Sequence, residues 1–333
     1  MLSTTGAVAS KVIDLRYIDK LVHSPRSLDS SVSVPSLKSP LFSIFLNYKY
    51  PKWWTAAYRL SSLTMAADGG ANRIFDMAKD CLPSFPSDQY PLKLDYVHGD
   101  FDSVRPEVLS YFSSVGSTII PSDNQNNNDL MKCLTLMDRV LRFSDKGKTV
   151  VPPPMGVEEE EAASSPEIDE MRGRYIIIGG TGGRLDHTLA NISAIFQLKD
   201  ERINLIKQDA KELAGMREKE EEYGWIPSAR ASFVPLRSIH LFSDTNDVTL
   251  RIPRGESTIF LPTHTPIVKM GLFPLSLSGS GPIFTQGLKW DLRGHRLGFE
   301  HFVSSSNEPS ENVISIRTAE PLLCTAVLDK EII

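Results

Sequence analysis

The fold is decided by the stretch LTMAADGGANRIFDMA, residues 63–78. Its first five residues form an apolar run, which predicts a buried strand. From Ala71 to Ala78 the apolar residues recur at helical spacing, which predicts a helix. Asp68, Gly69 and Gly70 lie between the two and predict a tight turn. A strand that passes through a glycine turn into a helix is typical of parallel sheets covered by helices.

The same alternation of strand and helix runs outward from this stretch in both directions. Apolar runs at 42–46, 94–97, 118–120 and 175–178 predict further strands. Helical spacing predicts helices at 53–63, 106–116, 130–141 and 185–198. The sequence therefore predicts an α/β N-terminal domain over residues 39–200, with a mainly parallel, Rossmann-like sheet.

Residues 231–333 have a different sequence pattern. They consist of short β-rich runs separated by turns that contain Pro, Gly, Asn and Asp. This pattern predicts a C-terminal all-β sandwich.

Three segments, one of them inside the α/β domain, lack both patterns. Residues 1–38 show no sustained apolar period and are predicted to form a poorly ordered N-terminal arm. Residues 143–173 contain three consecutive prolines and an acidic run, a composition that predicts a disordered acidic insertion. Residues 201–230 are rich in Lys and Glu and predict a charged insertion, to which we assign no chemistry.

Composition excludes several classes of protein. The 333 residues are 41% hydrophobic and carry a net charge of −5, so no global positive field attracts nucleic acid. No apolar run reaches the roughly 18 residues of a membrane-spanning helix, and we expect no membrane association. Three widely separated cysteines, and an N-terminal stretch without the features of a secretory signal, favour a reducing, cytoplasmic location.

Acidic residues follow three successive predicted strands, at the ends where open α/β sheets bind ligands. They are Asp68, the pair Asp100 and Asp102, and Asp129. Carboxylates without a His or Cys companion suit a hard cation such as Mg²⁺, which bridges substrate phosphates. For any one of Asp68, Asp102 and Asp129, helix capping is the alternative, since each precedes a predicted helix.

Two other segments could bind ligands. The turn GGTGGRLDH, residues 179–187, offers backbone N–H groups and the Arg184 guanidinium to a phosphate, with Asp186 placed to orient Arg184. It lacks the Gly-Lys-Ser/Thr of a P-loop. Trp290 lies in a polar turn and could stack on a flat cationic ring, or it could fill the core of the sandwich; both alternatives stay open.

Six motifs in order across residues 41–330 together resemble the thiamine pyrophosphokinase family, in a eukaryotic form with insertions. They are ADGGANR from Ala67, GDFDS from Gly99, NDLMKCL from Asn128, GGTGGRLDH from Gly179, GLKWDL from Gly287 and VSSSN from Val303. The resemblance implies an α/β catalytic domain, a β-sandwich that binds thiamine, and a homodimer with its sites at the subunit interface. It also implies a transferase that moves the pyrophosphoryl group of ATP to the thiamine hydroxyl, giving thiamine diphosphate and AMP, with Mg²⁺ as cofactor.

The resemblance assigns roles to individual residues. Asp68, Asp100, Asp102 and Asp129 become catalytic, and the first three hold Mg²⁺. ATP and its phosphates would be bound by Gly69, Asn72, Arg73, Lys132, Gly180, Thr181, Gly183, Arg184 and Asp186. Thiamine would be bound by Trp290 of the partner subunit, with Ser304, Ser305, Ser306 and Asn307 nearby. Two points stay open: the family usually has Thr where this chain has Asn128, and either Asp100 or Asp129 could accept the hydroxyl proton.

Two rival functions fit parts of the sequence. A dinucleotide-dependent oxidoreductase predicts a GxGxxG motif after the first strand, and none occurs there. A non-catalytic nucleotide-binding protein has no reason to place carboxylates at the ends of successive strands. Joint formation of AMP and thiamine diphosphate from ATP and thiamine would distinguish the transferase from both.

Overall fold

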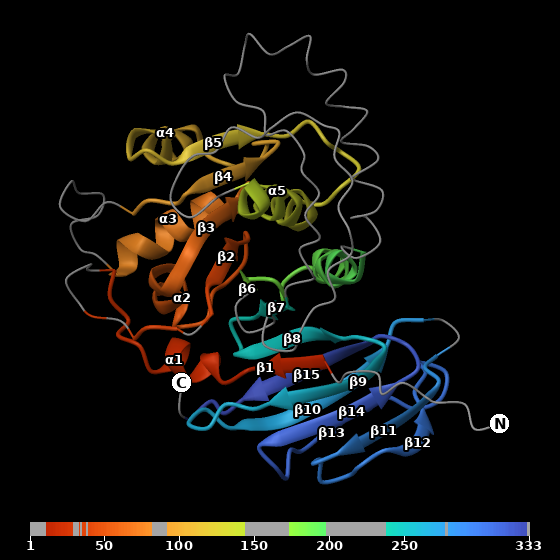
Figure 1. Cartoon of the computed structure of the whole chain (residues 1–333). Coiled ribbons are helices and arrows are strands. Elements are labelled where there is room, and N and C mark those ends of the chain that lie inside the picture. The colour runs from red at the N-terminus through yellow and green to blue at the C-terminus, as the bar shows by residue number, and fades with distance from the viewer. Residues whose placement is uncertain are drawn as a thin grey trace.

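One continuous sheet of ten strands runs through the molecule, with a second sheet of five strands packed against one half of it (Figure 1). This computed structural model describes residues 11–28, 33, 35–37, 39–81, 92–143, 173–197, 238–276 and 279–331. The predicted insertion at 201–230, and all of the predicted 143–173 insertion except its two end residues, lie outside the described residues. Within the described part of the chain, no helix is long and apolar enough to cross a membrane.

The N-terminal half of the large sheet is parallel. Its strands, in spatial order, are β7 (Ser238–Phe242), β6 (Arg174–Ile178), β2 (Leu41–Phe45), β3 (Ser61–Ala67), β4 (Tyr96–Gly99) and β5 (Thr118–Pro121). Every residue of β2 is buried, as expected for a strand covered by helices on both faces.

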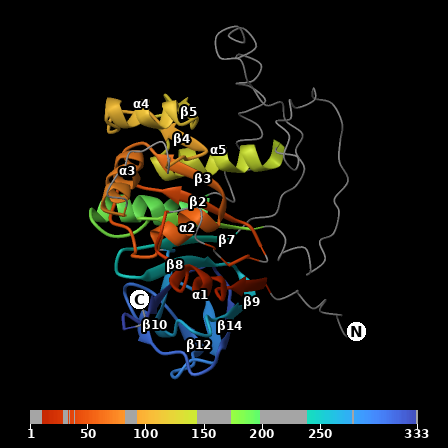
Figure 2. The same ribbon diagram turned by 90° about the vertical axis from the view of Figure 1, so that its left-hand side faces the viewer.

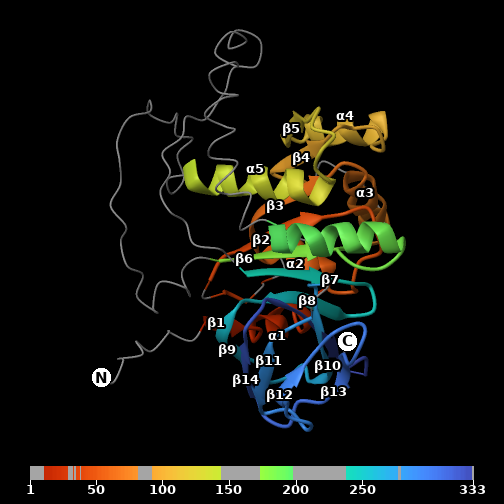
Figure 3. The ribbon, with the colours of Figure 1, turned by 90° about the vertical axis from the view of Figure 1, so that its right-hand side faces the viewer.

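Helices cover both faces of this parallel sheet. The helices α2 (Trp54–Leu60), α3 (Gly70–Cys81) and α4 (Pro106–Ser114) share one core with Leu41 and Phe45 of β2. The helix α5 (Asp129–Phe143) and a helix over 185–197 share another core with Phe42 and Ile44. Because successive side chains of a strand point to opposite faces, these two cores lie on opposite sides of the sheet. Figure 2 faces the first set of helices, and Figure 3 faces α5 and the helix over 185–197.

The C-terminal half is a two-sheet β structure. The large sheet continues through the antiparallel strands β8 (Asp247–Ile252), β15 (Leu322–Leu328), β10 (Ile267–Pro274) and β13 (Ser304–Asn307). The second sheet has the order β1 (Lys11–Asp14), β9 (Gly255–Phe260), β14 (Val313–Thr318), β11 (Pro282–Gln286) and β12 (Arg293–Arg296). The predicted fold class, a parallel α/β part followed by an all-β sandwich, is confirmed.

The predicted boundary at residue 231 does not divide the sheet. Strand β7 was predicted to begin the β domain, but it pairs in parallel with β6 and completes the α/β sheet, while its antiparallel pairing with β8 leads into the sandwich. Four of its five residues are buried. A short apolar run has the same pattern in a parallel sheet and in a sandwich core, so its sequence could not tell the two apart.

The prediction of a poorly ordered arm over residues 1–38 is wrong for its central part. Residues 11–14 form β1, which pairs in parallel with β9, and α1 (Tyr17–Val22) follows directly. Leu15, Ile18 and Leu21 are fully buried. A four-residue strand and a six-residue helix are too short to show a hydrophobic period, and here tertiary burial stabilises elements that local sequence does not reveal. We call residues 11–22 the N-terminal strap.

Candidate active site

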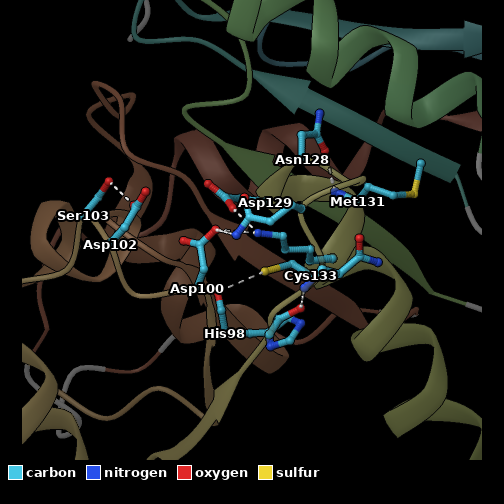
Figure 4. Close-up of polar contacts among 12 residues, drawn as sticks. His98, Asp100, Asp102, Ser103, Asn128, Asp129, Met131 and Cys133 are labelled. Carbon is cyan, nitrogen blue, oxygen red and sulfur yellow. Dashed lines mark hydrogen bonds and ion pairs between the residues drawn. The ribbon is translucent and has the colours of Figure 1, made fainter. Parts of the chain in front are cut away.

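The predicted acidic residues meet at one edge of the parallel sheet. Asp68 follows β3, Asp100 and Asp102 follow β4, and Asp129 is the first residue of α5. Carboxylate oxygens of Asp68, Asp100 and Asp102 all lie within 4.8 Å of one another. Figure 4 shows Asp100 and Asp129 turned toward each other, with Asp102 beside them. The structure therefore brings together all four carboxylates that the sequence singled out.

Asp68 is the most buried carboxylate of this group. Its backbone has a φ of 41°, an unusual value for a residue with a side chain, and its N–H donates to the carbonyl of His98 on the neighbouring strand. The Oδ1 atom is buried without a hydrogen-bond partner among the described residues. Burial raises the pKa of Asp68, and the nearby charges of Asp129 and Asp102 raise it further. A bound cation would remove both penalties.

Lys132 is the cation that the chain itself places in the group. Its Nζ lies 3.0 Å from Asp100 Oδ2 and 3.3 Å from Asp129 Oδ1, and its side chain is only 4% exposed. Burial alone would lower the pKa of Lys132, but the hydrogen bond to Asp100 and the charge of Asp129 raise it above its usual value. In return, the hydrogen bond from Lys132 lowers the pKa of Asp100. Both charged forms are therefore stabilised near neutral pH.

Helix capping does not explain Asp102 or Asp129. The Asn128 Oδ1 accepts from the N–H of Met131 at 2.8 Å, so Asn128 caps α5 and leaves the Asp129 carboxylate to Lys132. Helix α4 begins at Pro106, and Asp102 instead accepts from the Ser103 hydroxyl at 2.7 Å. Neither Asp102 nor Asp129 therefore caps the helix that follows it.

The predicted phosphate-binding residues of α3 separate into two kinds. The Asn72 amide donates to the carbonyl of Ser103 at 2.8 Å and accepts from the N–H of Arg105 at 2.9 Å, which fixes the loop that carries Asp100 and Asp102. Arg73, by contrast, is half-buried and has a buried Nε without a partner in the described structure. The Asn72 amide is therefore fully used within the fold, whereas one N–H group of Arg73 has no partner among the described residues. Gly69 lies in the turn between Asp68 and α3.

The Gly-rich turn follows β6 at the same edge of the sheet. The N–H groups of Gly179 and Gly180 both donate to the carbonyl of Phe242, so Gly180 does not offer its N–H to a phosphate. Thr181 has a buried Oγ1 without a partner among the described residues. Arg184 is 71% exposed and pairs with Asp186, which holds it as the sequence predicted. Gly183 lies in the chain between Thr181 and Arg184 and has a φ of +66°.

Trp290 is on the surface of the β half. The residue is 54% exposed, so the alternative of a core tryptophan is wrong. The buried Asn307 braces its backbone, accepting from Trp290 N–H at 3.1 Å and donating to Trp290 carbonyl at 2.8 Å. Lys289 Nζ lies 4.6 Å from the centre of the Trp290 ring and 2.7 Å from Glu308 Oε2. Two hydrogen bonds hold the backbone of the turn, and the exposed Trp290 ring has the Lys289 ammonium over it.

The serines beside Asn307 differ in their exposure. Ser304 is buried, and Ser305 and Ser306 are exposed on β13. Strand β13 lies seven strand positions from β3 in the large sheet. At about 4.8 Å per strand, the separation along the sheet is about 34 Å. Within one chain, the structure does not bring Trp290 and the carboxylates together.

Sequence reasoning missed two parts of this edge. Gln125 Nε2 lies 3.4 Å from Asp100 Oδ2. The loop after β2 also reaches the site, because Asn47 lies against Gly69 and Tyr48 lies against the Gly-rich turn. The position of this loop after the first strand of the sheet was the available signal, although neither residue type suggested a role.

Family models match both halves of the chain. The model described as "Thiamin pyrophosphokinase, catalytic domain" matches residues 55–207, and "Thiamin pyrophosphokinase, vitamin B1 binding domain" matches residues 262–323. The chain belongs to the thiamin pyrophosphokinase family. The first match contains the four carboxylates, Lys132 and the Gly-rich turn, and the second contains Trp290 and β13.

Curated relatives and solved structures agree with this family. Thiamine pyrophosphokinase 1 of Oryza sativa subsp. japonica is 28% identical over 86% of this chain and 86% of its own length. Thiamine pyrophosphokinase 2 of Arabidopsis thaliana is 26% identical over 95% of this chain and 96% of its own. The crystal structure of yeast thiamin pyrophosphokinase has a TM-score of 0.65 at 19% identity, covering 98% of this chain and 94% of the yeast chain. That structural likeness supports the fold.

Proposed function

We propose that this chain transfers the pyrophosphoryl group of ATP to the hydroxyl of thiamine, forming thiamine diphosphate and AMP. The observation that carries the proposal is the cluster of Asp68, Asp100 and Asp102 within a chain that matches the family's catalytic and vitamin-binding models. A dinucleotide-dependent oxidoreductase and a non-catalytic nucleotide-binding protein are not favoured, since neither accounts for both matches.

The cluster fits Mg²⁺ because its ligands are oxygens alone and one of them, Asp68 Oδ1, is buried without a partner in the described structure. Asp68, Asp100 and Asp102 would hold the ion. When bound, Mg²⁺ neutralises charge on the phosphate oxygens of ATP. Arg73 Nε and Thr181 Oγ1 have no partner among the described residues and could bind the phosphates, together with Arg184, which is exposed and oriented by Asp186. Positioning and charge neutralisation supply most of the rate.

The transfer is a single displacement at phosphorus. The thiamine oxygen forms a bond to the β-phosphorus, and the bond between that phosphorus and the oxygen bridging to the α-phosphorus breaks, so that AMP leaves. The hydroxyl proton goes to a carboxylate. We assign this step to Asp129, because it lies outside the three-oxygen cluster and its side chain is 46% exposed.

The proposal includes a homodimer with shared sites. The separation of about 34 Å between β13 and β3 leaves each Trp290 too far from the carboxylates of its own chain. A partner subunit could place its exposed Trp290 over the thiamine, where stacking and cation–π attraction contribute about 0.5–2 kcal/mol. A cytoplasmic location is supported by the three cysteines, all of which are free.

The central experiment measures both products. The protein, ATP, Mg²⁺ and thiamine are expected to give AMP and thiamine diphosphate in equal amounts, and formation of ADP would contradict the proposal. Asp100→Asn is expected to lose nearly all turnover because it removes a ligand charge without changing shape. Asp80→Asn, an exposed substitution near the far end of α3, is the matched control and is expected to retain activity.

The shared site has its own test. Trp290→Ala is expected to raise the KM for thiamine by about 2- to 30-fold while leaving the KM for ATP nearly unchanged. At thiamine concentrations well below the KM of the Trp290→Ala homodimer, mixed dimers of Asp100→Asn and Trp290→Ala subunits should regain about one unimpaired site each, because each subunit supplies what the other lacks. No recovery in a mixture shown to exchange subunits would refute the shared site.

A further inference from the structure

The sheet has a topological switch point between β2 and β6. From β2 the chain crosses over α2 to β3, whereas from β6 it continues into the helix over 185–197, which packs on the opposite face. The connections that leave β2 and β6 therefore run to opposite faces of the sheet. Open α/β sheets bind ligands in the crevice between two such connections. The loop after β2 and the Gly-rich turn after β6 flank that crevice.

Tyr48 fills this space from the β2 side. The half-buried ring lies directly on the backbone of Gly182 and Gly183, whose φ values are +104° and +66°. A Cβ atom on Gly183 would come within 2.5 Å of Tyr48 Cε2, and one on Gly182 would overlap the Cε1 atom. Glycine is therefore required at these positions for two reasons. It adopts a positive φ, and its lack of a Cβ atom lets the aromatic ring pack directly against the backbone.

The Gly-rich turn makes a second contact, with Thr188. The Thr188 hydroxyl lies 3.1 Å from both the N–H and the carbonyl oxygen of Gly182. Gly182 thus contacts both a hydroxyl and an aromatic ring. Its neighbours Thr181, Gly183 and Arg184 are the groups of this turn proposed to contact phosphate, so their positions depend on these two contacts.

We propose that Tyr48 is a positioning residue for the nucleotide: its ring holds the Gly-rich turn in the conformation that receives the ATP phosphates. The inference rests on the proposed function for its kinetic consequence, but the packing of Tyr48 can be tested without it. The nearest contacts to both glycines are ring carbons, so the ring and not the hydroxyl carries the effect. Tyr48 acts through the turn and forms no part of the chemical step.

The kinetic test compares Tyr48→Ala with Tyr48→Phe. Tyr48→Ala is expected to raise the KM for ATP about ten-fold, with less than a two-fold change in kcat and in the KM for thiamine. Tyr48→Phe keeps the ring and is expected to restore the ATP KM. Equal losses for ATP and thiamine, or a Tyr48→Phe variant as impaired as Tyr48→Ala, would overturn the proposal. If Tyr48→Ala does not fold, Tyr48→Leu keeps the bulk without the flat ring and is expected to show the same selective rise.

Hydrogen exchange of the substrate-free protein gives the second readout. The amides of residues 181–184 are expected to exchange faster in Tyr48→Ala, or in Tyr48→Leu, than in the unmodified chain and in Tyr48→Phe. Unchanged exchange would overturn the inference whatever the enzyme does. If the unmodified chain forms no thiamine diphosphate while exchange still responds to Tyr48, the proposed function fails and the packing role of Tyr48 stands.

Discussion

A buried histidine at the junction of the two halves should make the stability of this protein depend on pH. His240 on β7 is fully buried, and its Nδ1 lies 2.6 Å from the hydroxyl of Tyr17 in the N-terminal strap. Its Nε2 is buried without a partner among the described residues. Burial, assisted by the charge of Arg174, lowers the pKa of His240 to about 3.

The size of the effect follows from the difference between the folded and unfolded pKa values. Below about pH 6.5 the unfolded chain takes up a proton on His240, whereas the folded chain does so only near pH 3. The unfolded state therefore binds more protons in this window, and stability falls as pH falls. Between pH 7.5 and 5.5 this one group should remove about 1.4 kcal/mol from the free energy of unfolding.

Urea unfolding at the two pH values measures this loss. His240→Gln cannot titrate, so its pH-dependent loss is expected to be smaller than that of the unmodified chain by about 1.4 kcal/mol. His301→Gln, at an exposed histidine, is the matched control and is expected to keep the full dependence. The comparison is between slopes, so a general destabilisation by His240→Gln does not affect it. If His240→Gln keeps the same dependence as the unmodified chain, the histidine is not held neutral by burial.

Three further predictions concern the active site. Lys132→Met removes the hydrogen bond that lowers the pKa of Asp100, so the acid limb of the kcat/KM profile should move to higher pH, as a pH–rate series would show. Asn307→Ala removes the brace on the Trp290 backbone and should raise the thiamine KM while the ATP KM stays constant, as steady-state kinetics would show. Asp68→Asn removes a charged ligand and should weaken Mg²⁺ binding at least ten-fold in calorimetry of the substrate-free protein, whereas unchanged binding would remove Asp68 from the metal site.

The α/β half was predictable from sequence because each strand and helix has its own hydrophobic period and ends at a recognisable turn. The run before Asp68 and the helix after Gly70 each have a clear period, and the turn between them carries glycine. Parallel strands end at one edge, so residues after successive strands had to meet there. The N-terminal strap was not predictable, because its burial depends on partners more than two hundred residues away, such as Tyr17 with His240.

The residues of the candidate site were predictable by type and position, but the sequence did not show which of them face a ligand and which support the fold. A carboxylate after a strand looks the same in sequence whether it caps a helix or faces a ligand, and only the cap supplied by Asn128 separates the two possibilities for Asp129. Tyr48 escaped notice because its partners are backbone atoms of Gly182 and Gly183, which carry no side-chain signal.

The motif residues differ in whether their polar atoms already have hydrogen-bond partners in the folded chain. Residues whose polar atoms lack partners can bind a ligand, and residues whose polar atoms are all paired support the site. The side-chain amides of Asn72 and Asn307 each donate to one backbone group and accept from another. Binding a substrate through these amides would break hydrogen bonds that stabilise the fold. Asp68 and Thr181 each keep a buried oxygen without a partner among the described residues, which is unfavourable until a ligand satisfies it. A cation at Asp68 and a phosphate at Thr181 would supply these two oxygens with partners. Substrates that bind these groups in the folded state should raise the free energy of unfolding of the protein.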